Sequence, residues 1–138
     1  MTDHRIQNKR FAFLGGGIIA GVFIERIRNA RVTTSDSILT TDIDQTKLDS
    51  LSKRFGIKTS LKNRDGADFG DIIFLAVSPG TVKAVLSESC LMVQPDQIII
   101  SLAAAVPVWV IESVLCKEVP VVRVIPNTPS LIGAGVNP

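Results

Sequence analysis

Three consecutive glycines, Gly15 to Gly17, separate a short apolar run from a segment with helical periodicity, and this change of period constrains the fold more than any other feature. The run over residues 10–14 is typical of a buried strand that enters a tight turn. After the glycines, apolar residues recur at the spacing of one helix face, which predicts an amphipathic helix over residues 18–29. A strand, a glycine turn and a helix therefore open the chain.

The same alternation continues along the rest of the sequence. Further strands are expected at residues 37–42, 57–59, 71–77, 97–102 and 119–125. Helices are expected before Gly56, after Ser78-Pro79 and after Pro107. Residues 60–70 are polar and their pattern is ambiguous, with a helical turn as one interpretation. About six strands alternating with four or five helices predict an α/β fold, a Rossmann-type doubly wound and mainly parallel sheet in a three-layer α/β/α single domain.

Length and charge narrow the classes of function. With 138 residues, of which 46% are hydrophobic and 20% charged, the chain suits one globular domain. Its net charge of +2 is too small to predict nucleic-acid binding. The apolar stretch over residues 11–24 follows Lys9-Arg10 but is shorter than the ~20 residues of a membrane helix, and it runs into Glu25-Arg26 without a cleavage pattern. We therefore expect no membrane association.

The two cysteines, Cys90 and Cys116, are far apart in sequence and lack a C-x-x-C pattern or companion histidines. This arrangement indicates neither a metal site nor a disulfide framework, and it favours a reducing, cytoplasmic location.

Residues 15–20 (G-G-G-I-I-A) fit the pattern G-x-G-x-x-G/A directly after a strand and at the start of a helix, where the motif has physical meaning. Gly15 permits the tight turn, and the missing side chain of Gly17 lets a pyrophosphate approach the backbone at the helix N-terminus. A glycine turn that merely packs tightly is the alternative. The motif predicts dinucleotide binding by Gly15, Gly17, Ile18 and Ile19.

Asp42 stands at the end of the predicted second strand, where a carboxylate can accept hydrogen bonds from the adenosine ribose. Such a carboxylate would repel a 2′-phosphate, Asp44 adds to the repulsion, and Ile43 offers no cation to offset it. The sequence therefore favours NAD(H) over NADP(H). The alternative is that Asp42 or Asp44 simply caps the following helix.

Ligands of such sheets bind beyond the carboxyl ends of the strands, which here carry small or uncharged side chains suited to a nicotinamide ring. These ends are Ser78-Pro79, Ala103-Ala104-Ala105 and residues 126–129 (P-N-T-P). The alternatives are that the prolines simply begin ordinary loops and that the alanines simply allow close packing. Because the chain has no tyrosine and its one histidine is His4, in a polar leader, no catalytic residue is predicted.

Four segments in the same order resemble the N-terminal domain of the pyrroline-5-carboxylate reductase family. They are residues 13–17 (FLGGG), 71–79 (DIIFLAVSP), 100–104 (ISLAA) and 121–129 (VVRVIPNTP). The resemblance implies an oxidoreductase of proline biosynthesis that transfers a hydride from NAD(P)H to a small cyclic imine. It also implies that the nicotinamide lies near Ala76, Val77, Ser78, Pro79, Ala103, Ala104 and Asn127.

The chain departs from this family at three places. Ile18-Ile19 replaces a usual Asn-Met, and Ala105 replaces the last glycine of an Ala-Ala-Gly segment. Asp42-Ile43 replaces an Asn-Arg or Ser-Arg pair that holds a 2′-phosphate, which favours a switch to NAD(H), although the resemblance leaves NADP(H) possible.

The resemblance also divides the chain. Residues 1–9 form a polar leader, residues 10–130 the dinucleotide-binding domain, and residues 131–138 the start of a linker to a C-terminal helical domain that the chain lacks. In the family that domain makes the dimer and most substrate contacts, so a homo-oligomer is possible and the isolated chain is expected to be inactive. The alternative is a stand-alone, non-catalytic dinucleotide-binding regulatory module. Two other groups share the architecture, the deazaflavin-dependent NADP reductases and the prephenate or hydroxy-acid dehydrogenases. The sequence of residues 126–129 favours the pyrroline-5-carboxylate reductase family over both groups.

Overall fold

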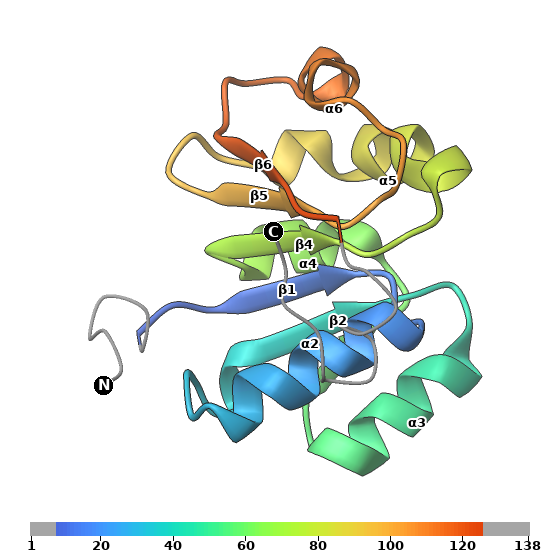
Figure 1. Ribbon diagram of the computed structural model, residues 1–138, viewed down its shortest axis with the longest axis vertical. Coiled ribbons are helices and arrows are strands. Elements are labelled where there is room, and N and C mark those ends of the chain that lie inside the picture. Colours follow the sequence, from blue (N-terminus) through green and yellow to red (C-terminus); the bar gives the residue numbers. More distant parts are fainter. Residues whose placement is uncertain (1–7, 126–138) are drawn as a thin grey trace.

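A computed structural model describes residues 8–125, which form one six-stranded parallel sheet (Figure 1). The strands are β1 (Phe11–Leu14), β2 (Ile38–Thr41), β3 (Lys58–Ser60), β4 (Ile72–Leu75), β5 (Ile98–Ser101) and β6 (Val121–Arg123). Their order across the sheet is β3-β2-β1-β4-β5-β6, and each neighbouring pair is parallel. The direction of winding reverses between β1 and β4, as in a doubly wound sheet.

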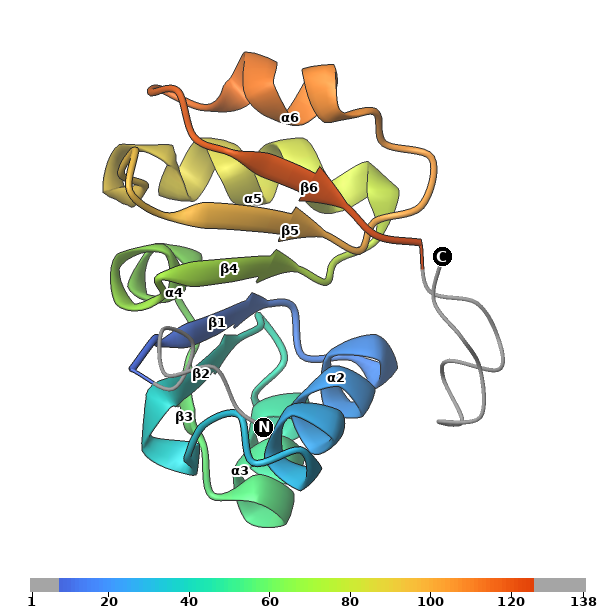
Figure 2. The same ribbon diagram turned by 60° about the vertical axis from the view of Figure 1, so that its left-hand side comes forward.

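Helices cover both faces of the sheet and give the three layers that the sequence predicts (Figure 2). One face carries α2 (Ile18–Asn29) and α3 (Gln45–Phe55), and the other carries α4 (Asn63–Phe69), α5 (Val82–Ser89) and α6 (Val108–Val114). The prediction of a Rossmann-type α/β fold is therefore confirmed. No helix within residues 8–125 is long and apolar enough to cross a bilayer.

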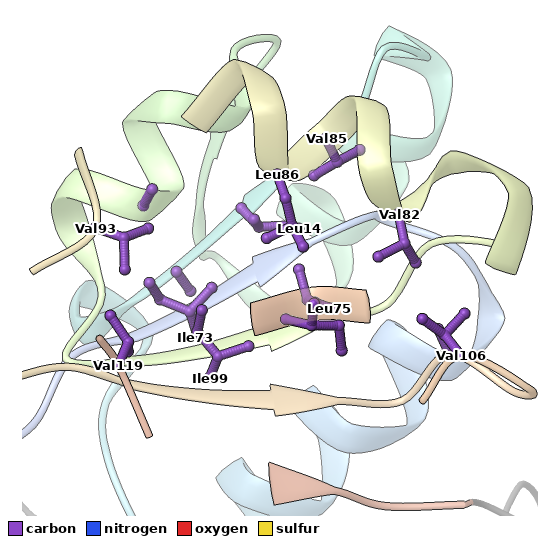
Figure 3. Close-up of a cluster of buried hydrophobic side chains, with 14 residues drawn as sticks. Leu14, Ile73, Leu75, Val82, Val85, Leu86, Val93, Ile99, Val106 and Val119 are labelled. Atoms are coloured by element: carbon purple, nitrogen blue, oxygen red, sulfur yellow. The ribbon is translucent and has the colours of Figure 1, made fainter. Parts of the chain in front are cut away.

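Alternating strand residues build a core on each face because successive side chains of a strand point to opposite sides. In β1, Ala12 and Leu14 pack with α4, α5 and α6 in the cluster shown in Figure 3. Phe11 and Phe13 point to the other face and pack with α2 and α3, where the rings of Phe13 and Phe74 stack with centroids 4.5 Å apart. Both faces of the central strands are thus buried.

The ends of α3 show how local signals set its bounds. Asp44 is the N-cap, and its carboxylate accepts a hydrogen bond from the Thr46 amide at 2.9 Å. Gly56 follows the last helical residue with φ of 67°, a left-handed conformation that glycine adopts without steric cost. The expectation that Gly56 ends the helix is confirmed, and of the two residues named in the capping alternative it is Asp44 that caps the helix.

The helix α4 lies in the polar segment that the sequence left ambiguous. Its inward face consists of Asn63, Gly66 and Ala67, which are all buried. A Cβ built on Gly66 would overlap the Leu14 side chain, so the small residues of α4 allow it to pack closely on β1. A helix with such a face shows little apolar periodicity, which explains why sequence reasoning supported no more than a turn.

Candidate dinucleotide-binding site

The glycine turn is held by a close approach between β1 and β4. Gly15 has φ of 110°, and a Cβ built on it would overlap the carbonyl oxygen of Ala76. The Gly15 amide also donates a hydrogen bond to the Thr41 carbonyl at 2.8 Å. Only glycine fits this position, because its conformation strains any other residue and its surroundings leave no room for a side chain.

Asp42 binds the next residue of the turn. Its Oδ2 atom accepts a hydrogen bond from the Gly16 amide at 2.8 Å, and its Oδ1 atom accepts one from the Asp44 amide at 2.8 Å. The carboxylate therefore holds the end of β2 against the turn. Each carboxylate oxygen has a second acceptor site, so Asp42 retains the capacity to accept bonds from a ligand.

The start of α2 is open to an anion. Gly17 is the N-cap residue and has no side chain that could cap the first amides of the helix. The first turn also contains no acidic residue. A Cβ built on Gly17 would have no atom within 4 Å. Unpaired amides and the positive end of the helix dipole therefore face open space, an arrangement that favours a phosphate group.

A cavity of about 360 Å³ lies beside this turn at the carboxyl ends of the strands. It is lined by six of the predicted site residues, Gly15, Gly17, Asp42, Ala76, Val77 and Ser78. These residues come from three segments, the turn after β1, the end of β2 and the end of β4, which the strand order brings together.

The other predicted residues lie elsewhere or outside the described range. Ile18 is 81% exposed and lines an adjoining cavity between α2 and α3, while Ile19 packs partly buried against the core. Pro79 is exposed in a short 3-10 turn, Ala103 is buried and Ala104 is exposed. Asn127 lies outside the described residues.

Three polar residues that sequence reasoning missed also line the cavity, Lys47, Asn63 and Thr81. Lys47 lies in the first turn of α3 and adds a cation next to Asp42 and Ile43. Asn63 is buried, accepts a hydrogen bond from the Thr41 hydroxyl at 2.6 Å and donates one to the Glu88 carboxylate at 3.3 Å. A lysine three residues after the predicted cap was the available signal for Lys47, whereas Asn63 depends on the unforeseen α4.

Comparison with known proteins places this geometry in a family. Residues 10–105 match the family model described as "NADP oxidoreductase coenzyme F420-dependent". The chain belongs to this family. Its relatives include pyrroline-5-carboxylate reductase 1 of Bacillus subtilis (strain 168), which is 37% identical over 129 residues. That alignment covers 93% of this chain but 43% of the relative.

Solved structures agree with the sequence relatives. A pyrroline-5-carboxylate reductase from Coxiella burnetii superposes with a TM-score of 0.85 at 31% identity, covering 91% of this chain and 47% of that one. The pyrroline carboxylate reductase of Plasmodium falciparum, solved with NADP bound, superposes with a TM-score of 0.78 at 23% identity, covering 93% and 46%. The chain therefore spans about half the length of the reductases it matches.

The chemistry of the cavity suits binding and orientation more than proton transfer. Apart from Asp42 and Lys47, its polar side chains are the neutral groups of Asn63, Ser78 and Thr81. The residues of this family member fit a dinucleotide, because the space beside Gly17 and the open amides of α2 suit a pyrophosphate.

Proposed function

We propose that this chain is the NAD(P)-binding domain of a reductase of the pyrroline-5-carboxylate reductase type. The reaction is hydride transfer from the reduced dinucleotide to the C=N bond of a small cyclic imine. The observation that carries the proposal is the open N-terminus of α2 beside Gly17, facing the cavity that Asp42 also lines. The relatives support it, because they are pyrroline-5-carboxylate reductases.

Each part of the dinucleotide has a proposed partner. The pyrophosphate lies against the amides at Gly17, Ile18 and Ile19, and the adenosine ribose lies at Asp42. The nicotinamide lies along the strand ends, near Ala76, Val77, Ser78, Pro79, Ala103, Ala104 and Asn127. In this arrangement the backbone turn binds charge, and small side chains leave room for the ring.

The protein's own residues bind and orient, while the bound dinucleotide supplies the hydride. A cyclic imine can be protonated before hydride transfer, so the reaction does not require a histidine or tyrosine acid. We propose that substrate contacts and a homo-oligomer interface belong to the half of the relatives that this chain does not span, and that the enzyme acts in the cytoplasm. The relatives do not favour the reading of the chain as a regulatory module.

Cofactor choice depends on two opposing charges in the cavity. The Asp42 carboxylate disfavours a 2′-phosphate, whereas Lys47 can attract one. Both oxygens of Asp42 are already fixed by backbone amides, so the carboxylate is rigidly placed near the ribose position. We therefore propose that NADH binds more tightly than NADPH and that Lys47 reduces the difference.

Calorimetric titration of the protein with NADH and NADPH tests this proposal. Asp42→Ala is expected to weaken NADH binding by about tenfold, because it removes a charged acceptor for the ribose hydroxyls. Asp44→Ala is the matched control, since Asp44 lies two residues away and its carboxylate caps α3. Failure of the folded protein to bind NADH, or equal losses in the two variants, would contradict the proposal.

Lys47→Ala tests the second charge. Lys47 is exposed, so the substitution should leave the fold intact. NADPH binding should weaken more than NADH binding, which widens the preference for NADH. An unchanged ratio of the two dissociation constants would remove Lys47 from the site without affecting the role of Asp42.

A further inference from the structure

Thr41, the last residue of β2, makes contacts with two parts of the proposed site. Its carbonyl accepts the hydrogen bond from the Gly15 amide at 2.8 Å, and its hydroxyl donates one to the side-chain carbonyl of Asn63 at 2.6 Å. Thr41 is fully buried, and Asn63, the first residue of α4, is 7% exposed. Thr41 therefore joins the end of β2 both to the glycine turn and to the start of α4.

The two partners of Asn63 determine how its amide group is oriented. The Asn63 amide nitrogen donates a hydrogen bond to the Glu88 carboxylate on α5 at 3.3 Å. An ionised carboxylate only accepts hydrogen bonds, so the nitrogen must face Glu88 and the carbonyl must face the Thr41 hydroxyl, which can donate. The reversed amide would bring two acceptors together at Glu88. The orientation of Asn63 is therefore set by β2 on one side and by α5 on the other.

This orientation leaves one donor of Asn63 for a ligand. An amide nitrogen carries two N–H groups, and within residues 8–125 that of Asn63 makes a single hydrogen bond, the one to Glu88. Asn63 lines the cavity of the proposed site together with Asp42, which directly follows Thr41 in the chain. A donor left without a partner in a buried place is costly, and an oxygen of a bound ligand can satisfy it. The second N–H of Asn63 is thus available on the Asp42 side of the cavity.

We propose that this N–H donates to a ribose oxygen of the bound adenosine group and that Thr41 is a positioning residue that acts through Asn63. The inference rests on the proposed dinucleotide binding and adds a contact from α4 to it. A ribose hydroxyl can donate and accept at the same time, so the Asp42 carboxylate as acceptor and the Asn63 amide as donor are complementary to the ribose. Loss of the Thr41 hydroxyl removes the donor that holds the Asn63 carbonyl, and the amide then loses its fixed orientation.

Thr41→Val tests the proposal, and Thr40→Val is the matched control. The two threonines are consecutive in β2 and both fully buried. Within residues 8–125 the Thr40 hydroxyl has no hydrogen-bond partner, whereas that of Thr41 holds Asn63. In calorimetric titration, Thr41→Val should raise the dissociation constant of NADH about five- to tenfold, while Thr41→Ser, which keeps the hydroxyl, should stay within about twofold. Thr40→Val should leave it unchanged, and thermal melts show whether each variant is folded.

A double-mutant cycle separates positioning from a purely structural role. If Thr41 acts through Asn63, Thr41→Val should cause no further loss of NADH binding in protein that already carries Asn63→Ala. A loss of the same size with and without Asn63→Ala would overturn the positioning role. If Asn63→Ala does not fold, the serine variant decides instead, because equal losses in Thr41→Ser and Thr41→Val would overturn the role of the hydroxyl.

ADP-ribose, which contains the adenosine and the pyrophosphate but lacks the nicotinamide, locates the contact. Thr41→Val should weaken the binding of ADP-ribose and of NADH by the same factor. A loss confined to NADH, or a Thr41→Val protein that binds NADH as tightly as Thr40→Val does, overturns this inference and leaves the proposed function intact. A folded, unsubstituted protein that binds neither ligand overturns both.

Discussion

The Asp42 carboxylate binds the Gly16 amide at 2.8 Å, and this bond joins the end of β2 to the middle of the glycine turn. The same carboxylate binds the Asp44 amide, so one side chain holds both the turn and the approach to α3. A residue expected to contact a cofactor therefore also has a structural role. This dual role means that the effects of its substitution on stability and on binding must be measured separately.

We predict that Asp42→Ala lowers the free energy of unfolding by about 1–3 kcal/mol, because two backbone amides lose a charged acceptor. Asp42→Asn should lose less, since its amide oxygen can still accept one of these bonds. Urea denaturation without any dinucleotide measures both. Asp49→Ala is the control, because within residues 8–125 its side chain accepts a single, exposed hydrogen bond, from Gln45, and it should change stability by less than about 0.5 kcal/mol. Equal stability of Asp42→Ala and the unsubstituted protein would show that the bonds are not formed in solution.

The two ends of the glycine turn should lose very different amounts of stability when replaced by alanine. Gly15→Ala should destabilise the fold by at least about 2 kcal/mol, because its methyl group overlaps the Ala76 carbonyl and its φ is positive. Gly17→Ala should cost less than about 1 kcal/mol, since its methyl group enters open space. It should nevertheless weaken NADH binding, because that space is the proposed pyrophosphate position. Thermal melts and NADH titrations of both variants check this pair, and a well-folded Gly15→Ala protein would contradict the geometry.

Ala105 has φ of 59°, a left-handed conformation that is unfavourable for a residue with a Cβ. Glycine adopts this conformation without steric cost, and it is the residue that the resemblance implies at this position. We predict that Ala105→Gly raises the free energy of unfolding by roughly 0.5–1 kcal/mol. Ala104→Gly, at the neighbouring exposed position, should lower it through greater freedom of the unfolded chain. Denaturation curves that show the same sign for both variants would disagree with this prediction.

The raised pKa of the Cys116 thiol gives a prediction about its reactivity. A higher pKa leaves less thiolate at pH 8, and the thiolate is the form that reacts with iodoacetamide. Cys90→Ala removes the largest cause of the rise and should lower the pKa of Cys116. Alkylation of Cys116 in this variant should therefore be faster at pH 8, and the rates should converge at a pH well above the thiol pKa. Identical rate profiles in the two proteins would mean that the side chains do not interact.

The sequence was sufficient for features that depend on neighbouring residues. The change of period around Gly15 predicted β1, the turn and α2, and the predicted helix over residues 18–29 agrees with the observed one. Gly56 predicted the end of α3 because the backbone conformation after a helix depends on the residue at that position. Alternation of strands and helices then predicted a parallel doubly wound sheet, since short connections and right-handed crossovers leave few other arrangements.

Tertiary structure alone decided which distant residues meet. The contact of Gly15 with Ala76 requires β1 and β4 to be neighbours, and the buried place of Asn63 requires α4, whose inward face has no apolar period. Lys47 enters the site through the packing of α3 against the sheet. Periodicity reports which side of an element is buried, but it carries no information about which other element covers that side.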